Sequence, residues 1–336
     1  MLKDGFQKMI DKTYPLVSIA IPTYNRADAY LKYAIQSAIN QTYKKIEIII
    51  SDNCSIDNTE TVAKEFTDPR IRYFRQGKNI GANNNFNFCL EQAKGDYFLL
   101  LQDDDVIDND FIESCINAAG YKTDIGIIRT GTRLIDSQGK VLSEIPNMVE
   151  GMSTEHFFRG WFAGKTSLYL CSTLFNTERL REIGGFQSKH NLFQDVIAEV
   201  QLAARFGRVD VQDVKASFRK HPSEMTLAAK VGNWCEDSLI LLDLICELVS
   251  EESKRMVRDE GTRFFSKINY SRASKVRSPI KLFFSFLTVF KKFNYRYPPS
   301  KDHLLSPLYQ VLYGTPIYYG MRFIKRKMER LLANVN

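Results

Sequence analysis

The chain of 336 residues lacks the features that mark several common protein classes. No apolar run approaches about 18 residues, so the sequence predicts no membrane-spanning helix. There are four histidines and no two of the six cysteines form a CxxC pair, which argues against a zinc site and favours buried free thiols. Residues 1–14 are polar and lack an apolar core of signal-peptide length. We therefore expect a cytoplasmic, reducing location.

Glycine-rich phosphate loops are also missing. No GxGxxG follows the first predicted strand, residues 17–21, which argues against a nicotinamide-dependent dehydrogenase. Residues 22–26 carry no glycine-rich triphosphate loop of the kind expected in an enzyme that makes sugar nucleotides. A phosphoacceptor receiver domain is also disfavoured, because it would account neither for Asp195 nor for a chain of this length.

Charge is distributed unevenly along the chain. The net charge is +7, but residues 261–336 hold 15 Lys and Arg against two acids, about +13, so the remainder is about −6. A basic tail indicates an anionic partner. Within it, residues 278–293 are apolar with basic ends, and residues 321–328 are basic and partly amphipathic. Both segments suit an interfacial helix on anionic lipid, and packing against the catalytic domain is the alternative. No nucleic-acid-binding motif is present.

Strands and helices alternate over the first hundred residues. Apolar runs predict strands, and helical spacing of apolar residues predicts the segments between them. The expected strands are residues 17–21, 46–50, 71–74 and 97–101, and the expected helices are residues 29–39, 57–66 and 83–93. This order predicts parallel strands with helices on both faces, in an α/β fold with a doubly wound mixed sheet and a helical C-terminal extension. In such sheets ligands bind beyond the carboxyl ends of the strands. Residues 125–130, 133–135 and 168–175 are further predicted strands. Beyond residue 223 the chain is predicted to be helical.

Acidic residues follow these strands. Asp103, Asp104 and Asp105 directly follow an apolar strand, and such hard oxygen ligands suit Mg2+ or Mn2+. A solvated turn that caps the next helix is the alternative. Asp52 ends the second strand and could accept hydrogen bonds from a base or ribose, or form an Asx turn. Asp195 precedes a predicted helix, where it would be a general base or an N-cap.

Five ordered motifs together resemble glycosyltransferase family 2, the inverting nucleotide-sugar enzymes of the GT-A fold. The resemblance covers about residues 15–221. It is carried by the segments PTYNR (22–26), SDNCSIDNT (51–59), NIG (79–81), GD (95–96) with LQDDD (101–105), and GGF (184–186) with QD (194–195). A run of three aspartates alone would not be specific.

The resemblance implies roles for individual residues. Asp195 matches the general base, and Asp104 and Asp105 match the metal-binding element for Mn2+ or Mg2+. Residues matching nucleotide-binding positions are Pro22, Thr23, Tyr24, Asn25, Asp52, Asn79, Gly81 and Asp103. His221 resembles a histidine that approaches the diphosphate, and a surface histidine is the alternative. Two positions depart from the family pattern: Gln102 stands where an acid is common, and Gln194 replaces the usual Glu beside the base.

The expected function is transfer of a sugar from a nucleotide donor, UDP first and dTDP or GDP next, to a hydroxyl on a lipid-linked or surface glycan such as O-antigen or capsule. No QxxRW element is present, which favours single additions. The alternative is a catalytically silent docking subunit of a glycan-synthesis complex. The expected division is a lead-in of residues 1–14, a GT-A domain of residues 15–222 and a helical basic region of residues 223–336. The location expected is peripheral, on the inner face of the cell membrane.

Overall fold

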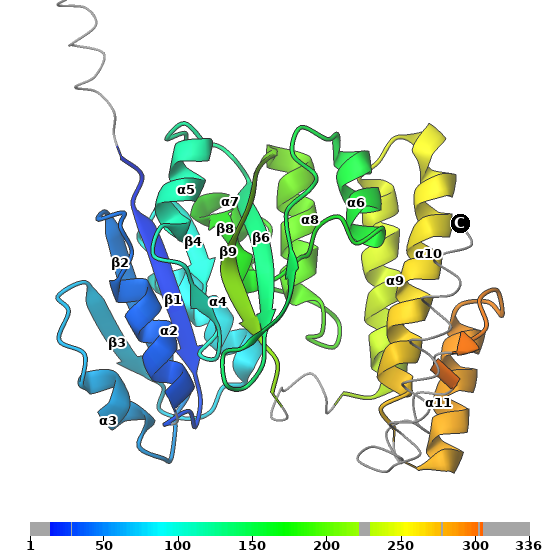
Figure 1. Cartoon of the computed structure of the whole chain (residues 1–336), viewed down its shortest axis with the longest axis horizontal. Helices are drawn as coiled ribbons and strands as arrows, with labels where there is room; N and C mark the ends of the chain where they lie inside the picture. The colour runs from blue at the N-terminus through cyan, green and yellow to red at the C-terminus, as the bar shows by residue number, and fades with distance from the viewer. Residues whose placement is uncertain (1–13, 28, 222–228, 277, 302, 305–336) are drawn as a thin grey trace, which may run out of the picture. The chain divides into compact units, whose positions relative to one another are not determined.

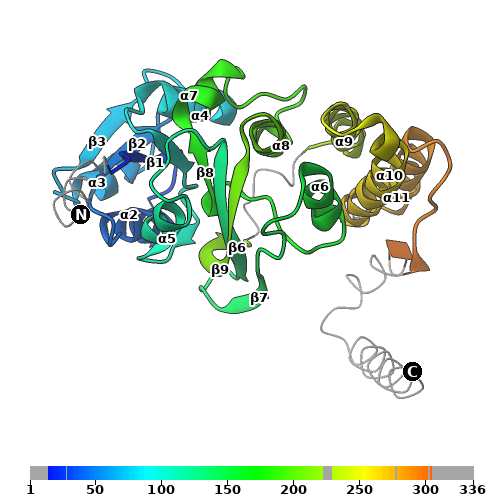
Figure 2. The ribbon, with the colours of Figure 1, turned by 90° about the horizontal axis from the view of Figure 1, so that it is seen from above.

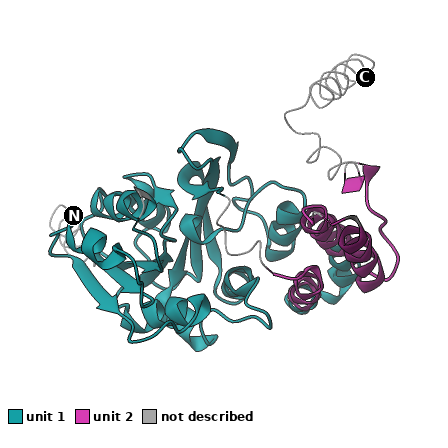
Figure 3. Cartoon of the chain, turned by 90° about the horizontal axis from the view of Figure 1, so that it is seen from below, with its two compact units in different colours: residues 1–227, 243–258 teal, residues 228–242, 259–336 magenta. Residues whose placement is uncertain are grey.

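The structure, a computed structural model, describes residues 14–27, 29–221, 229–276, 278–301 and 303–304. The chain divides into two compact units, residues 1–227 with 243–258 and residues 228–242 with 259–336 (Figure 3). The division expected at residues 14 and 222 stays a prediction. The basic segment 321–328 lies outside the described residues.

The first unit is built on a mixed sheet of nine strands (Figure 1). The strands are β1 (Val17–Thr23), β2 (Ile46–Asp52), β3 (Ile71–Arg75), β4 (Tyr97–Leu100), β5 (Val106–Ile107), β6 (Ile127–Ile135), β7 (Val141–Ile145), β8 (Thr173–Asn176) and β9 (Arg208–Arg219). Their order is β3-β2-β1-β4-β8-β6-β9-β5, with β7 paired to β6. The strands β3, β2, β1 and β4 are parallel, as expected, and β8 runs antiparallel to both of its neighbours.

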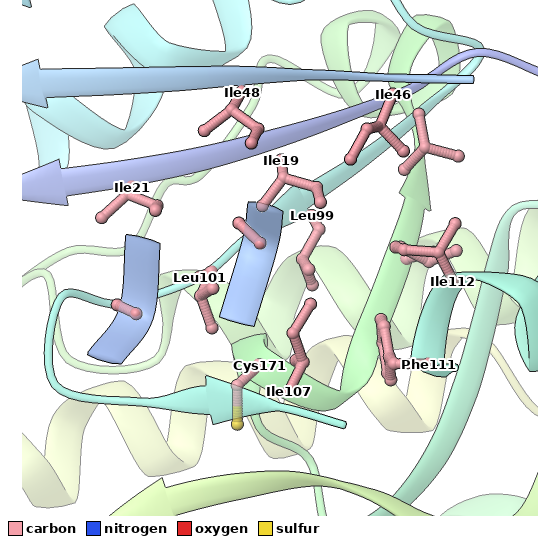
Figure 4. Close-up of a cluster of buried hydrophobic side chains, with 14 of the residues drawn as sticks. Ile19, Ile21, Ile46, Ile48, Leu99, Leu101, Ile107, Phe111, Ile112 and Cys171 are labelled. Carbon is pink, nitrogen blue, oxygen red and sulfur yellow. The ribbon is translucent and has the colours of Figure 1, made fainter. Parts of the chain in front are cut away.

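Helices cover both faces of this sheet (Figure 2). They are α2 (Ala29–Ile39), α3 (Thr59–Lys64), α4 (Ala82–Gln92), α5 (Phe111–Ala118), α6 (Thr154–Phe162), α7 (Thr177–Glu182) and α8 (Gln194–Phe206). On one face, alternate residues of the central strands such as Ile19, Ile48 and Leu99 pack in a fully buried cluster with Phe111 and Ile112 of α5 (Figure 4). Burial of these side chains is the main stabilising term for the sheet.

The structure corrects two sequence expectations in the second half of the sheet. A strand was expected over residues 168–175, but a 3-10 turn (Leu170–Ser172) precedes β8, because Ser172 and Thr173 hydroxyls donate to the carbonyl of Tyr169. A break was expected between residues 130 and 133, but β6 continues through Gly131. A Cβ on Gly131 would lie 2.8 Å from the carbonyl oxygen of Ile145, so only glycine fits there.

The described part of the second unit is helical, as predicted. Its residues come from α9 (Val231–Glu247), α10 (Glu251–Ala273) and α11 (Pro279–Lys292). Residues 243–258, which include the end of α9 and the start of α10, belong to the first unit. Within the second unit, the Arg272 guanidinium lies 3.6 Å from the ring centroid of buried Trp234. In the part of the chain that the structure describes, no helix combines the length and apolar character needed to cross a membrane.

Candidate functional site

Several of the predicted site residues lie at the carboxyl ends of three adjacent parallel strands. Thr23, the last residue of β1, pairs with Asp52, the last residue of β2. On the other side of β1, Leu100 of β4 pairs with Ala20, and the chain beyond it continues to the three aspartates. The sheet therefore brings the first, second and fourth strand ends together, as the sequence predicted.

The loops after β1 and β2 are hydrogen-bonded to each other. The backbone N–H of Asn25 donates to the Ser55 hydroxyl at 2.8 Å, and its side-chain oxygen accepts from the N–H of Ile56 at 2.9 Å. Asn25 has a φ of +50°, a left-handed conformation that asparagine tolerates better than most residues. Pro22 and Thr23 are buried beneath this loop, while Tyr24 is 41% exposed. The loop is thus held in shape and presents an aromatic ring.

Asp52 is completely buried and is engaged by its own chain. One carboxylate oxygen accepts from the N–H of Ser55 at 2.8 Å, and the other accepts from the Tyr73 hydroxyl at 2.7 Å. The guanidinium of Arg75 lies 3.7 Å away. The bond to Ser55 reaches three residues along the chain, one more than in the Asx turn that is the alternative role of Asp52. Each oxygen retains a further lone pair that can accept a hydrogen bond.

Asn79 and Gly81 are tied to the end of β2. The Asn79 side-chain oxygen accepts from the side-chain amide of Asn53 at 3.0 Å and from the N–H of Gly81 at 2.9 Å. Gly81 has a φ of +84°, which glycine adopts without strain, and it immediately precedes α4. The segment 79–81 therefore lies beside the β1 and β2 loops.

The three consecutive aspartates have different surroundings. Asp103 is nearly buried, and Arg26 Nε lies 3.3 Å from its carboxylate. Burial raises the pKa of Asp103 to about 6, with the Arg26 charge opposing the shift and the Asp104 charge adding to it. Asp105 is also buried, accepts from the backbone N–H of Arg219 at 2.8 Å, and has its pKa raised, first by burial and then by Asp104. Asp105 thereby fastens the motif to β9.

Asp104 is the most exposed of the three and faces His221. Asp104 Oδ2 lies 2.7 Å from His221 Nε2 and 3.5 Å from an Arg26 guanidinium nitrogen. The backbone carbonyl of Asp104 accepts from Arg219 Nε at 2.8 Å. The structure thus brings His221, just beyond β9, to Asp104, which is 117 residues earlier in the chain.

The donor chemistry at Asp104 and His221 fits a divalent metal. A carboxylate oxygen and an imidazole nitrogen in contact are a ligand pair that Mn2+ accepts, with further positions left for phosphate oxygens. Among residues 14–304 as described, no group of three or more His, Cys, Asp or Glu side chains is arranged to hold a metal ion. Asp104 and His221 are two donors at this point, and one carboxylate oxygen of Asp105 accepts from the N–H of Arg219.

Asp195 lies in the first turn of α8, at the end of a segment held by α4. The backbone N–H of Phe186 donates to the side-chain oxygen of Asn87 at 2.8 Å, and its carbonyl accepts from Asn83 and Asn87. Gly185 has a φ of +76°, and a Cβ there would lie 2.4 Å from the same Asn87 oxygen. Burial raises the pKa of Asp195 to about 6, which suits a group that must accept a proton near neutral pH.

Two features of this region were not predicted from the sequence. The first is Arg26, which lies in the segment of residues 22–26 but was given no role. The second is a buried ion-pair network beneath Asp195, in which Arg129 of β6 lies 3.3 Å from Glu199 and 3.5 Å from Asp210. Burial raises the pKa of Glu199 to about 8. The four-residue spacing from Asp195 to Glu199, which places both on one face of α8, was the available signal.

The chain is similar in sequence to known glycosyltransferases. Residues 18–173 match the sequence model described as Glycosyl transferase family 2. A Rickettsia felis protein named as an uncharacterized glycosyltransferase is 36% identical over 75% of the chain and 42% of its own length. A Campylobacter jejuni protein, named as a GalNAc(5)-diNAcBac-PP-undecaprenol beta-1,3-glucosyltransferase, is 30% identical over 59% of the chain and 66% of its own length. The chain spans less than half the length of the Rickettsia relative.

Two solved structures share the fold. Staphylococcus aureus TarS 1–349 in complex with UDP-GlcNAc matches with a TM-score of 0.58 at 15% identity, covering 83% of the chain and 89% of that structure. The mannosyltransferase PcManGT from Pyrobaculum calidifontis, in complex with GDP-Man and Mn2+, matches with a TM-score of 0.54 at 15% identity, covering 93% and 84%. The expected GT-A fold is thereby confirmed.

Proposed function

Because residues 18–173 place the chain in glycosyltransferase family 2, we propose that it transfers a sugar from a nucleoside diphosphate donor to an acceptor hydroxyl, inverting the anomeric carbon. The observation that carries this proposal is the contact of Asp104 with His221 beside Arg26, at the strand ends where α/β sheets bind ligands. One cationic and two metal-ligating side chains at this point suit a diphosphate.

The nucleotide occupies the loops after β1, β2 and β3. Asp52 accepts a hydrogen bond from the base through its remaining lone pairs, and Tyr24 offers its exposed ring. Pro22, Thr23 and Asn25 line the same side, and Asn79, Gly81 and Asp103 approach the ribose and sugar. The donor is UDP-linked, as supported by the UDP-GlcNAc bound to the TarS structure, with dTDP and GDP as outcomes of the test below.

Asp104 and His221 hold a divalent metal, Mn2+ or Mg2+. When bound, such an ion neutralises the negative charge that develops on the departing diphosphate. Mn2+ in the PcManGT complex supports this choice. Arg26 adds a fixed positive charge beside the same carboxylates. Asp105 accepts from the N–H of Arg219 with one carboxylate oxygen, and its role as a second carboxylate ligand stays a prediction.

The transfer is a single displacement. The acceptor oxygen attacks C1 of the donor sugar, the bond from C1 to the phosphate oxygen breaks, and the nucleoside diphosphate leaves with the electron pair. Asp195 takes the proton of the acceptor hydroxyl, and general-base help of this kind contributes about 10²–10⁴ in rate. With a pKa of about 6, Asp195 is ionised and ready to accept a proton at neutral pH.

The acceptor is a lipid-linked or surface glycan, of the O-antigen or capsule type. The name of the Campylobacter relative, which specifies an undecaprenol-linked acceptor, supports this proposal. A polyprenyl-linked acceptor resides at the membrane, so the enzyme works from the cytoplasm at the inner face of the cell membrane, with its basic C-terminal region toward anionic lipid.

Thermal denaturation of the whole chain with UDP, dTDP, GDP or CMP, each with and without Mn2+, tests the donor site. One nucleotide at about 100 times its dissociation constant should stabilise the fold by about 2.7 kcal/mol, and only with metal. Asp104→Asn should lose this gain, whereas Asp213→Asn, an exposed acid on β9, should keep it. No gain with any nucleotide would contradict the proposal and favour a catalytically silent docking subunit. Release of nucleoside diphosphate from the matching sugar nucleotide would separate an enzyme from such a subunit.

A further inference from the structure

Helix α11 has an inner face that packs within the second unit. The Phe286 ring meets the Tyr270 ring edge to face at 5.6 Å between centroids. Val289 and Phe293, which follow at spacings of three and four residues, are buried. The N-terminus of the helix is capped by Ser278, whose side chain accepts from the N–H of Lys281. These contacts fix which side of α11 points away from the unit.

The opposite, outer face of α11 exposes a stripe of large apolar side chains. Ile280, Phe283, Phe284 and Leu287 are 71%, 64%, 57% and 43% exposed. Their spacing of three, four and seven residues places all four within about 100° around the helix axis. Membrane contact and packing on the catalytic domain are the two roles that the sequence leaves open for Phe283, Phe284, Leu287 and Phe290. In the structure the first three side chains are exposed and Phe290 is partly buried. A contiguous apolar stripe of this kind marks an interaction surface.

The charges around this outer face are of one sign. Helix α11 has no acidic residue. Lys281 flanks the stripe at its first turn, and Lys291, one turn beyond Leu287, continues it; both are exposed. Lys292, on the side of the helix toward the unit, lies 3.0 Å from Glu236. An apolar stripe with lysines at both ends matches the hydrocarbon boundary and the anionic headgroups of a lipid surface.

We propose that the outer face of α11 docks on an anionic lipid bilayer, with the helix axis in the plane of the membrane. Fourteen residues span about 21 Å, short of the roughly 30 Å needed to cross, so the helix lies on the surface. The biological purpose of this docking rests on the proposed function, because a membrane-linked acceptor would then meet an enzyme held at the same surface.

Charge also argues against two other partners for the outer face of α11, a second copy of the chain and segment 305–336. In a symmetric pair of outer faces, Lys281 and Lys291 of one copy would meet those of the other without an acid on either helix to offset them. Segment 305–336 of the same chain carries five basic residues and one acid, so it offers little negative charge to these lysines. Anionic lipid supplies the negative charge that neither alternative offers to these lysines.

Vesicle flotation of the full chain tests the apolar stripe. The chain should float with vesicles of phosphatidylcholine mixed with phosphatidylglycerol and not with phosphatidylcholine alone. The double variant Phe283→Ser with Phe284→Ser should weaken binding by about tenfold or more, since two apolar rings no longer enter the boundary. The matched control is Val141→Ser with Leu142→Ser, which removes two exposed apolar side chains from β7 of the first unit and should leave binding unchanged.

A charge-reversal pair tests the lysines. Lys281→Glu with Lys291→Glu should abolish the preference for phosphatidylglycerol and weaken binding by about tenfold or more. Lys122→Glu with Lys140→Glu, the same change of charge at exposed positions of the first unit, should have a much smaller effect. Equal losses in the two pairs would mean that binding follows net charge alone, and would overturn the assignment to α11.

Three further results would overturn the docking proposal. They are failure of the wild-type chain to bind the anionic vesicles, unchanged binding by the Phe283 and Phe284 variant, and a dimer in vesicle-free solution that this variant converts to a monomer. Nucleotide-dependent thermal stabilisation, measured on the same variants, should match the wild type. Its absence in all samples, wild type included, would count against the proposed function and leave the docking result standing.

Discussion

Replacing Asp195 by asparagine should stabilise the fold at neutral pH while it removes the proposed base. Burial in the first turn of α8 raises the pKa of this carboxyl from 3.8 to about 6. The folded chain therefore holds the proton more tightly than the unfolded chain does. The stability that this shift contributes is fully present below the unfolded pKa and is lost as the pH rises through about 6. At neutral pH the ionised form of the buried Asp195 is therefore unfavourable in the folded chain.

The magnitude follows from the shift. Two pKa units correspond to about 3 kcal/mol at neutral pH, an upper value because the side chain keeps partial contact with water. Against it stands the favourable interaction of a carboxylate with a helix N-terminus, about 0.3–1 kcal/mol, which Asp195→Asn loses. We expect a net gain of about 1–2 kcal/mol for Asp195→Asn near pH 7.5, shrinking by about 2 kcal/mol near pH 4.5.

Urea denaturation of wild type and variant at the two pH values measures the gain. Asp213→Asn, at an exposed position of β9, is the control and should change stability by less than about 0.5 kcal/mol at either pH. In the same preparations, sugar transfer by Asp195→Asn should fall by about 10²-fold or more while nucleotide binding persists. Two results would refute the conclusion that Asp195 is a buried carboxyl with a raised pKa. They are a variant less stable than wild type near pH 7.5, and a variant whose stability depends on pH as that of wild type does.

Three other substitutions have expected outcomes. His221→Ala should remove the metal-dependent part of the thermal stabilisation by nucleotide, because Asp104 loses its partner donor; a metal response equal to that of wild type would exclude His221 as a ligand. Gly185→Ala should lower the free energy of unfolding by about 2–3 kcal/mol in urea denaturation, because it combines a φ of +76° with a Cβ 2.4 Å from the Asn87 oxygen. Its control is Gly164→Ala, which has a φ of +74° in open space and should lower the same quantity by about 1 kcal/mol. Arg129→Leu should lower the free energy of unfolding by about 3–5 kcal/mol, because the buried side chains of Glu199 and Asp210 lose the guanidinium that they share. A loss below about 1 kcal/mol would show that the network is dispensable.

Local patterns in the sequence were sufficient for most of the first half of the fold. The helix expected over residues 29–39 is α2 with the same limits, and the first four strands differ by at most two residues at an end. Apolar periodicity and turn residues act over a few positions, which makes such elements predictable. The exceptions, at Gly131 and Leu170, arise where pairing with a distant strand or a side-chain hydroxyl decides the backbone.

The sequence by itself determined that acids would gather at one edge of the sheet, because parallel strands end on the same side and residues 52 and 103–105 directly follow apolar runs. Only the tertiary structure decided how the three aspartates divide their contacts: Asp103 with Arg26, Asp104 with His221, and Asp105 with Arg219. It also decided which face of α11 is exposed. Contacts between residues over a hundred positions apart depend on the packing of the whole sheet, and no local pattern carries that information.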